Sequence, residues 1–172
     1  LISISLNAPK IYSIDKENGF LLLEDLGDNL FSKVLNANNE ESLYKKAIDI
    51  LIYLHNRNIN QFSKNNLVEN YSDEKLISES ELFIEWYIKG HLNIKINENQ
   101  INEFKEIFSK IITSLQLKYD TLVLRDFHVD NLVLQHSRSG LRQVGLLDFQ
   151  DAVLGQSSYD LISLIEDVRR PI

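Results

Sequence analysis

A chain of 172 residues is long enough for one domain with a sizeable core, and its 44% hydrophobic and 25% charged content is ordinary for a globular protein. The net charge of −7 argues against a nucleic-acid binder, and no stretch reaches the roughly 18 apolar residues that a membrane span requires. The absence of cysteine excludes disulfides and thiolate metal sites, and no secretory leader pattern opens the chain, so we expect a cytoplasmic location. The sequence starts at Leu1 and contains no methionine, which predicts that it is part of a longer protein.

The first predicted elements are two short strands at residues 11–15 (IYSID) and 20–24 (FLLLE). Between them, Asn18 and Gly19 supply the positive φ that a tight hairpin turn needs. The DLGDNLF segment that follows is turn-like and leads into helical sequence.

Three helical segments come next. The first begins near residue 43, and its apolar residues recur at helical spacing and predict one buried face: Leu43, Ala47, Ile50, Leu51 and Leu54. The second is predicted around residues 78–89, and its apolar part is Leu82, Phe83, Trp86 and Tyr87. The third covers roughly residues 98–118, with Asn97 and Gln100 at capping-box spacing and an apolar stripe of Ile101, Phe104, Phe108, Ile111 and Leu115.

The pattern then changes to short apolar runs, which predict strands at residues 121–124, 132–135 and 143–149. The turn-prone HSRSG segment joins the last two. In the final segment, SSYDLISLIEDVRR, helical spacing predicts a buried face of Leu161, Leu164, Ile165 and Val168. Ser157 or Ser158 is the expected cap, and Arg169 and Arg170 stand at the C-terminal end of this helix. The whole pattern predicts a mainly helical α+β chain.

Polar residues gather where the short strands end. Asp126 and Asn131 lie five residues apart in the loop between the first two strands, and Asp148 lies near the end of the third. Asp and Asn favour such turns for local reasons alone, but strand pairing would bring these three side chains together. Carboxylate and amide oxygens suit Mg²⁺, and Asp126 beside such an ion could accept a proton from a hydroxyl. This combination is what phosphoryl transfer needs.

The sequence around these residues contains two motifs that resemble those of a known superfamily. The sequence LRDFHVDNL (124–132) resembles the D-x-x-x-x-N catalytic loop of the protein-kinase-like superfamily, and LLDFQDA (146–152) resembles its metal-binding D-F-G, with Gln150 in the glycine position. Together with YDLISLIED (159–167), these motifs are similar to the aminoglycoside phosphotransferase (APH) family. Within it they most resemble bacterial sugar kinases of the N-acetylmuramate/N-acetylglucosamine 1-kinase type. Leu124 and Arg125 stand where many members of the family have His and Gly.

The resemblance implies a protein-kinase-like fold in which residues 1–28 are the end of the N-lobe and the hinge, and residues 29–172 are the C-lobe. The catalytic loop is then 124–132 and the metal-binding segment 146–151. The implied roles are as follows: Asp126 is the catalytic base, Asn131 and Asp148 bind Mg²⁺, and the hinge residues Glu24, Asp25 and Leu26 hold the adenine of ATP (or the base of GTP). Asp160 would brace the catalytic loop by accepting backbone N–H bonds. The alternative for Asp160 is a capping role in the first turn of its own helix, behind Ser157.

The activity that the resemblance implies is ATP- and Mg²⁺-dependent phosphorylation of a small sugar, with the anomeric hydroxyl of an N-acetylated amino sugar favoured, as in cell-wall recycling. An aminoglycoside antibiotic kinase is the alternative within the same class. The chain has no G-x-G-x-x-G or Walker-type loop to cover phosphates, and most of an N-lobe is missing. A non-catalytic nucleotide- or sugar-binding fragment is therefore the alternative of a different class, and a fusion with a partner domain upstream is a third.

For the other polar residues near the loop, both a functional and a structural role are considered. Arg125 is expected to pair with a nearby carboxylate, and His128 to pack and hydrogen-bond within the loop and not to act as a ligand or an acid. Asp130 is either close to substrate or a solvated turn residue, and Asp151 follows the metal-binding Asp closely enough to contact metal-bound water or sugar. Trp86 with Glu79, Glu81 and Glu85 could line an acceptor pocket, but a core aromatic beside a solvated acidic face is the more ordinary interpretation.

Overall fold

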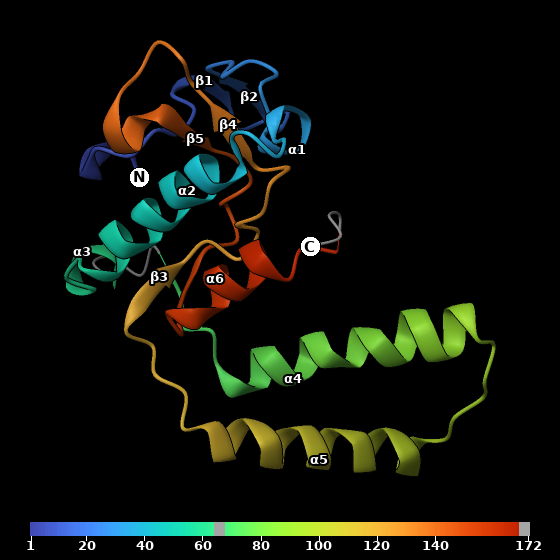
Figure 1. Cartoon of the computed structure of the whole chain (residues 1–172). Coiled ribbons are helices and arrows are strands. Elements are labelled where there is room, and N and C mark those ends of the chain that lie inside the picture. The colour runs from blue at the N-terminus through green and yellow to red at the C-terminus, as the bar shows by residue number, and fades with distance from the viewer. Residues whose placement is uncertain (64–67, 169–172) are drawn as a thin grey trace.

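The computed structural model describes residues 1–63 and 68–168 (Figure 1). Its helices are α1 (Phe31–Val34), α2 (Glu40–His55), α3 (Asn60–Ser63), α4 (Asp73–Leu82), α5 (Glu98–Leu115) and α6 (Ser158–Ile165), with a π-helix, η3 (Phe83–His91), continuing α4. Short 3₁₀ turns are formed by η1 (Ile2–Ile4) and η4 (Gly140–Gln143). The strands are β1 (Ile11–Asp15), β2 (Phe20–Leu23), β3 (Thr121–Val123), β4 (Leu132–Leu134), β5 (Val144–Leu146) and β6 (Val153–Gly155).

The strands form three antiparallel pairs, β1–β2, β3–β6 and β4–β5. The β4–β5 pair was predicted, with Leu132 opposite Leu146 in its register. Strand β6 was not predicted, and it, instead of β4, pairs with β3. Residues 69–71 extend this sheet, because Tyr71 N donates to Leu154 O and Leu154 N donates to Glu69 O, each at 2.8 Å.

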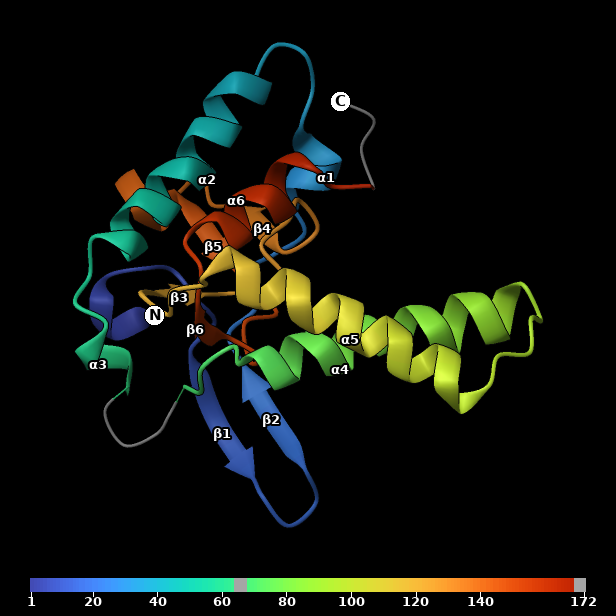
Figure 2. The same ribbon diagram turned by 90° about the horizontal axis from the view of Figure 1, so that it is seen from below.

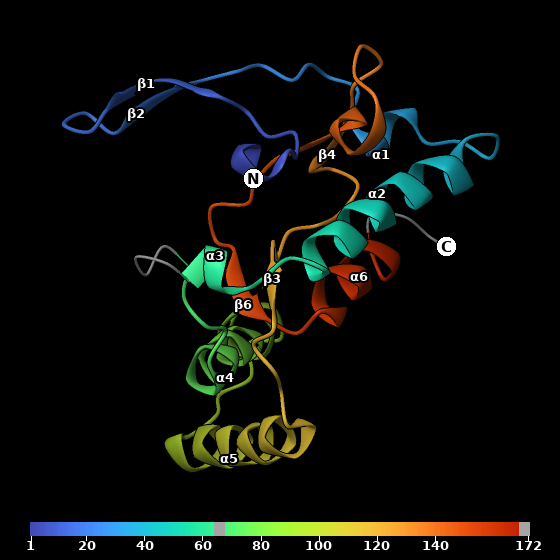
Figure 3. The ribbon, with the colours of Figure 1, turned by 90° about the vertical axis from the view of Figure 1, so that its left-hand side faces the viewer.

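The predicted β1–β2 hairpin is confirmed, with Gly19 at a φ of 74° in its turn. Asp15 organises this turn, since its side chain accepts from the backbone N–H groups of Glu17 and Asn18. The strands of the hairpin are exposed along their whole length, although they carry Ile, Tyr, Phe and Leu side chains. Figures 2 and 3 show that the hairpin projects away from the rest of the chain.

The core lies between α2, α6 and the short strands of the C-terminal half (Figure 1). The predicted inner face of α2 is confirmed, because its five apolar residues are all buried: Leu43, Ala47, Ile50, Leu51 and Leu54. From the other side, all residues of β3, β4, β5 and β6 are buried. The strands therefore pack against α2 in the core, and this packing fixes the positions at which the loops between them begin and end.

Helices α4, η3 and α5 form an antiparallel arm, called here the α4–α5 hairpin (residues 73–115), which extends beyond the core (Figures 1 and 2). The capping box predicted at Asn97 and Gln100 is present. The apolar residues named for the second helix are all exposed: Leu82, Phe83, Trp86 and Tyr87. Of the stripe predicted for the third helix, Ile111 and Leu115 are exposed. Among the described residues, helix α5 packs along one side against α4 and η3, so part of its stripe faces away from both. Within the hairpin, Phe104 stacks against Phe83 of η3.

The last helix is shorter than expected. Helix α6 ends at Ile165, and of the four residues predicted on its apolar face Leu164 is buried, whereas Leu161, Ile165 and Val168 are exposed. The predicted positions of Arg169 and Arg170 lie outside the described residues. Neither serine supplies the expected cap: Ser157 is the N-cap residue without a side-chain cap hydrogen bond, and Ser158 already lies inside the helix.

Candidate active site

The loop between β3 and β4 is anchored by its apolar residues and presents its polar ones. Phe127 and Val129 are buried in the core, whereas Asp126, the residue before Phe127, is exposed. The Val129 carbonyl accepts a hydrogen bond of 3.1 Å from Ser32 N in α1. Asp126 O accepts from His128 N and from the Asn131 side chain. The Asp126 carboxylate is therefore exposed, whereas the Asp126 carbonyl is held by hydrogen bonds and the next residue, Phe127, is held in the core.

Asp160 of α6 supports this loop from beneath. Its Oδ2 accepts from Leu124 N at 2.7 Å and its Oδ1 accepts from Arg125 N at 2.9 Å, and the residue is only 1% exposed. The hydrogen bonds expected of a loop-bracing Asp160 are present. Burial raises the pKa of the Asp160 carboxyl to about 6, against the opposing effect of the two N–H donors and with a smaller contribution from the nearby Asp126.

Asn131 and Asp148 are brought together by the register of β4 and β5. Leu132 pairs with Leu146, so the residues just before β4 and just after β5 are neighbours. A backbone hydrogen bond of 2.9 Å from Leu147 N to Asn131 O ties them directly. Asp148 has a φ of 55°, in the left-handed region, so the chain turns sharply at this carboxylate as it leaves the strand. The convergence predicted for Asn131 and Asp148 follows from this pairing.

The orientation of the Asn131 amide fits a cation. Its Nδ2 donates to Asp126 O at 3.0 Å and lies 3.3 Å from His128 Nε2, which can accept the second hydrogen. Both donors of the amide are then used, which leaves Oδ1 as the outward group. Asp148 Oδ1 accepts 2.7 Å from the Gln150 side chain, and its other oxygen is available. Two oxygen donors of this kind suit Mg²⁺, which keeps several waters or phosphate oxygens besides its protein ligands.

No group of three or more Asp, Glu or His side chains arranged to hold a metal occurs in residues 1–63 and 68–168. A cation here would therefore depend on the Asn131 and Asp148 pair, with its remaining ligands from solvent and substrate. With two protein ligands, such a site would be weak by itself and stronger when a phosphorylated ligand is also present.

The predicted hinge residues are held by the β4–β5 loop. Glu24 Oε1 accepts from Arg138 Nη2 at 2.9 Å, and a second guanidinium nitrogen of Arg138 donates to Asn7, which is buried. The Leu26 carbonyl accepts from the Gln135 side chain. Asp25 Oδ1 accepts from Gly27 N at 2.7 Å. The side chains of Glu24 and Asp25 are thus used within the protein, so backbone groups of this segment are the ones suited to a base.

Four other predicted residues lie in the catalytic loop or follow Asp148. Arg125 pairs with a carboxylate as expected, and that carboxylate is Glu79 of α4, at 2.9 Å. His128 hydrogen-bonds within the loop, to Asn131. Asp151 is exposed and Asp130 is half-buried.

The sequence patterns did not predict the contributions of Asn7, Gln135 and Arg138, because each forms a hydrogen bond with a residue more than 100 positions away.

Comparison with known proteins decides the family. A model of the APH phosphotransferase enzyme family matches residues 2–172. The chain belongs to this family.

Three curated relatives of this chain share one name. The chain is 32% identical to the N-acetylmuramate/N-acetylglucosamine kinase of Caulobacter vibrioides over 172 residues, 97% of this chain and 47% of the relative. The kinase of the same name from Pseudomonas putida is 33% identical over 97% of this chain and 46% of the relative. That of Neisseria meningitidis is 31% identical over 94% and 46%. The chain thus spans about half the length of the curated relatives it matches.

Solved structures confirm the predicted kinase-like fold. An aminoglycoside 2'-phosphotransferase-IIIa mutant in complex with GDP aligns with a TM-score of 0.57 and 16% identity, over 94% of this chain and 55% of the other. ADP-bound aminoglycoside phosphotransferase APH(2'')-Ib aligns with a TM-score of 0.57 and 20% identity, over 92% and 53%. At these identities the likeness concerns the fold alone. Among the residues that the structure describes, no helix combines the length and apolar character needed to cross a membrane.

Proposed function

We propose that the full-length protein is a kinase that transfers the γ-phosphate of ATP to the anomeric hydroxyl of an N-acetylated amino sugar. One observation carries the proposal: the Leu147 N to Asn131 O hydrogen bond joins two loops, so that Asn131 and Asp148 lie together beside Asp126. The names of the relatives, which match nearly the whole chain, support N-acetylmuramate or N-acetylglucosamine as the acceptor.

In the proposed reaction, Asp126 accepts the proton of the acceptor hydroxyl as its oxygen bonds to the γ-phosphorus. The bond between that phosphorus and the β–γ bridging oxygen breaks, and ADP leaves. Asn131 and Asp148 would hold Mg²⁺, which when bound neutralises charge on the phosphate oxygens. Asp160 acts through the backbone, because its two hydrogen bonds stop the segment before Asp126 from moving.

We further propose that residues 1–28 form the end of the N-lobe and the hinge, and residues 29–172 the C-lobe. Backbone groups of the Glu24–Leu26 segment would hold the nucleotide base. The Leu26 carbonyl is engaged by Gln135, and Glu24 N donates to Lys10 O, so the groups suited to a base are the Glu24 carbonyl and the Leu26 N–H. Adenine and guanine are both compatible with such contacts, and a cysteine-free chain is compatible with the cytoplasm.

The direct test incubates the full-length protein with ATP, Mg²⁺ and N-acetylmuramate or N-acetylglucosamine, and detects sugar phosphate by mass spectrometry. A 1-phosphate lacks the free anomeric hydroxyl, so the product must be non-reducing, whereas a 6-phosphate remains reducing. Product with aminoglycosides only would replace the acceptor in this proposal. Nucleotide binding without transfer to any acceptor would overturn the kinase assignment.

Variants test the assigned roles. Asp126→Asn and Asp148→Asn should each lower kcat by about 100-fold or more, because one removes the proton acceptor and the other a cation ligand. Both residues are exposed, so the urea unfolding midpoint should stay close to that of the wild type. Asp49→Asn, an exposed carboxylate on α2, is the matched control and should leave kcat unchanged. Wild-type turnover in either site variant would refute the assignment.

A further inference from the structure

Arg125 connects three elements at the point where the chain enters the catalytic loop. Its backbone N–H donates to Asp160 of α6 at 2.9 Å, and its carbonyl lies 3.4 Å from Ser163 Oγ on the same helix. Its side chain runs the other way and donates 2.9 Å to Glu79 Oε1 of α4. One residue before Asp126, the backbone is thus fixed to α6 and the side chain to the α4–α5 hairpin.

Glu79 is fully engaged by this arrangement. Its Oε1 accepts from Arg125, and its Oε2 accepts from the hydroxyl of Tyr71, a buried residue at the base of the hairpin. The Arg125 guanidinium also lies 5.2 Å from the centroid of the Tyr71 ring. Burial, together with the hydrogen bond to Glu79, raises the pKa of Tyr71, so its hydroxyl stays protonated and remains a donor. The ion pair is partly shielded, with side-chain exposures of 22% for Arg125 and 29% for Glu79.

The rest of the hairpin has little to hold it in place. Along α4 the residues are half-buried or exposed, and in residues 83–115, all described by the structure, Ile84 and Ile112 are the buried side chains. At the base, Tyr119 OH donates to Asp73 at 3.1 Å. Glu79 lies nearly two turns further along α4. At the base, Leu76 also packs against the buried cluster of Tyr71, Val123 and Val153. The Glu79 contact lies further along the arm, so it adds a restraint on the angle of the arm to those at the base.

The backbone of Arg125 indicates that its side chain is needed. Its φ is 72°, in the left-handed region that glycine adopts without strain and a side chain disfavours. Glycine would meet the same backbone demand at lower cost. Arginine has this strain but forms an ion pair with Glu79 of α4, which glycine cannot form.

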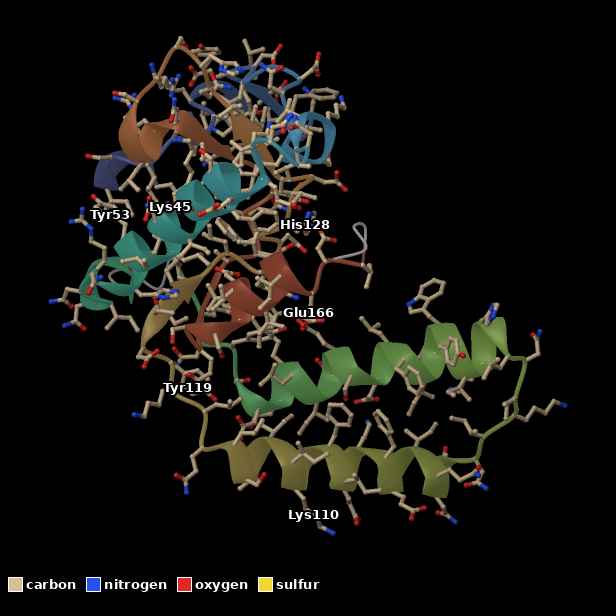
Figure 4. All side chains as sticks on the ribbon, viewed as in Figure 1. Lys45, Tyr53, Lys110, Tyr119, His128 and Glu166 are labelled. Carbon is tan, nitrogen blue, oxygen red and sulfur yellow. The ribbon has the colours of Figure 1, made fainter. Side chains whose placement is uncertain are left out.

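We propose that Arg125 and Glu79 are positioning residues that set the α4–α5 hairpin relative to Asp126, and thereby the fit of the sugar acceptor. The acceptor part of this statement rests on the proposed kinase function, whereas the hairpin part does not. The arm projects from the side of the core on which His128 of the loop lies (Figure 4). A change in its angle would alter the space in front of Asp126 and leave undisturbed the Glu24–Leu26 segment, which is bound to Gln135 just after β4.

A distance measurement tests the hairpin directly. Residues 1–172 contain no cysteine, so Lys45→Cys on α2 and Lys95→Cys at the tip of the hairpin form a pair for spin labels in the full-length protein, once any cysteine outside residues 1–172 has been replaced. Glu79→Gln and Arg125→Gly should each shift or broaden the distance distribution by several ångströms. Arg125→Gly keeps the φ of 72° accessible, so its effect reports the lost side chain and not a broken loop. The control is Glu81→Gln, which removes the 2.8 Å pair between α4 and Lys105 of α5 and should match the wild type.

Kinetics supply the second measurement. Glu79→Gln and Arg125→Gly should lower kcat/KM for the sugar by about tenfold or more, with the KM for ATP within about twofold of the wild type. A merely structural loss would change both substrates alike. Distance distributions that superpose on the wild type would overturn the inference, even if activity fell. If the wild type transfers no phosphate, the kinase proposal fails and the distance measurement alone decides the role of the pair.

Discussion

Replacing Asp160 with asparagine removes a charge that the fold keeps buried, at nearly the same side-chain volume. The carboxylate is 1% exposed and accepts the N–H groups of Leu124 and Arg125. Burial nevertheless raises its pKa from an ordinary 3.8 to about 6. The folded state therefore holds a proton on Asp160 more tightly than the unfolded chain does.

The sign and size of the consequence follow from proton linkage. Below about pH 4, Asp160 is protonated in both states and contributes no pH dependence. Between about pH 4 and 6 the unfolded chain ionises first, so the free energy of unfolding falls as the pH rises. Above about pH 6 both states are ionised and the effect is complete. A pKa raised from 3.8 to about 6 corresponds to roughly 3 kcal/mol.

The assay is urea unfolding of the wild type and Asp160→Asn from pH 4 to pH 8, followed by circular dichroism. Subtracting the two curves cancels every other titrating group that the proteins share. The free energy of unfolding of the wild type minus that of the variant should fall by roughly 2–3 kcal/mol between pH 4 and 7 and then level off. A difference that stays flat would mean that the two N–H donors balance burial, and one that rises with pH would mean that they outweigh it; either result would overturn this prediction.

Two further predictions concern packing. A Cβ on Gly145 would lie 2.7 Å from Leu26 Cδ1 in the proposed hinge, so Gly145→Ala should lower the free energy of unfolding by about 1–3 kcal/mol and weaken nucleotide binding, measured by urea titration and calorimetry; unchanged values for both would contradict this. Leu164→Ala should cost about 2–5 kcal/mol because the side chain is fully buried, whereas Leu161→Ala on the same helix, 38% exposed, should cost much less, and equal losses would contradict the packing described for α6.

The sequence was most informative where structure is local. The inner face of α2 could be predicted because five apolar residues repeat at helical spacing, and all five are buried. The β4–β5 pair could be predicted from two apolar runs around a turn-prone segment. The Asn131 and Asp148 neighbourhood follows from that pair, because the register places one residue before β4 next to the other after β5.

Long-range partners were out of reach of pattern reasoning. Strand β6 has three residues and no alternation, and its place in the structure is decided by β3, about 30 positions earlier. Glu79 and Arg125 are 46 positions apart, and Glu24 and Arg138 are 114 apart. Helical spacing also fixes which residues share a face without saying what the face meets. For this reason Trp86, expected as a core aromatic, is 76% exposed on a hairpin that extends beyond the core of the described residues.

The hydrogen bonds of Asn131 explain why this position calls for an amide when a carboxylate has the same shape. Its Nδ2 donates to the Asp126 carbonyl and lies 3.3 Å from His128 Nε2. An aspartate would place an anionic oxygen against the Asp126 carbonyl, and the repulsion would turn the side chain away from its present orientation. The proposed cation position would then face one more negative charge on a less ordered side chain. The chemical identity of residue 131 is therefore decided by the half of the side chain that points into the protein, and its usefulness to a ligand by the half that points away.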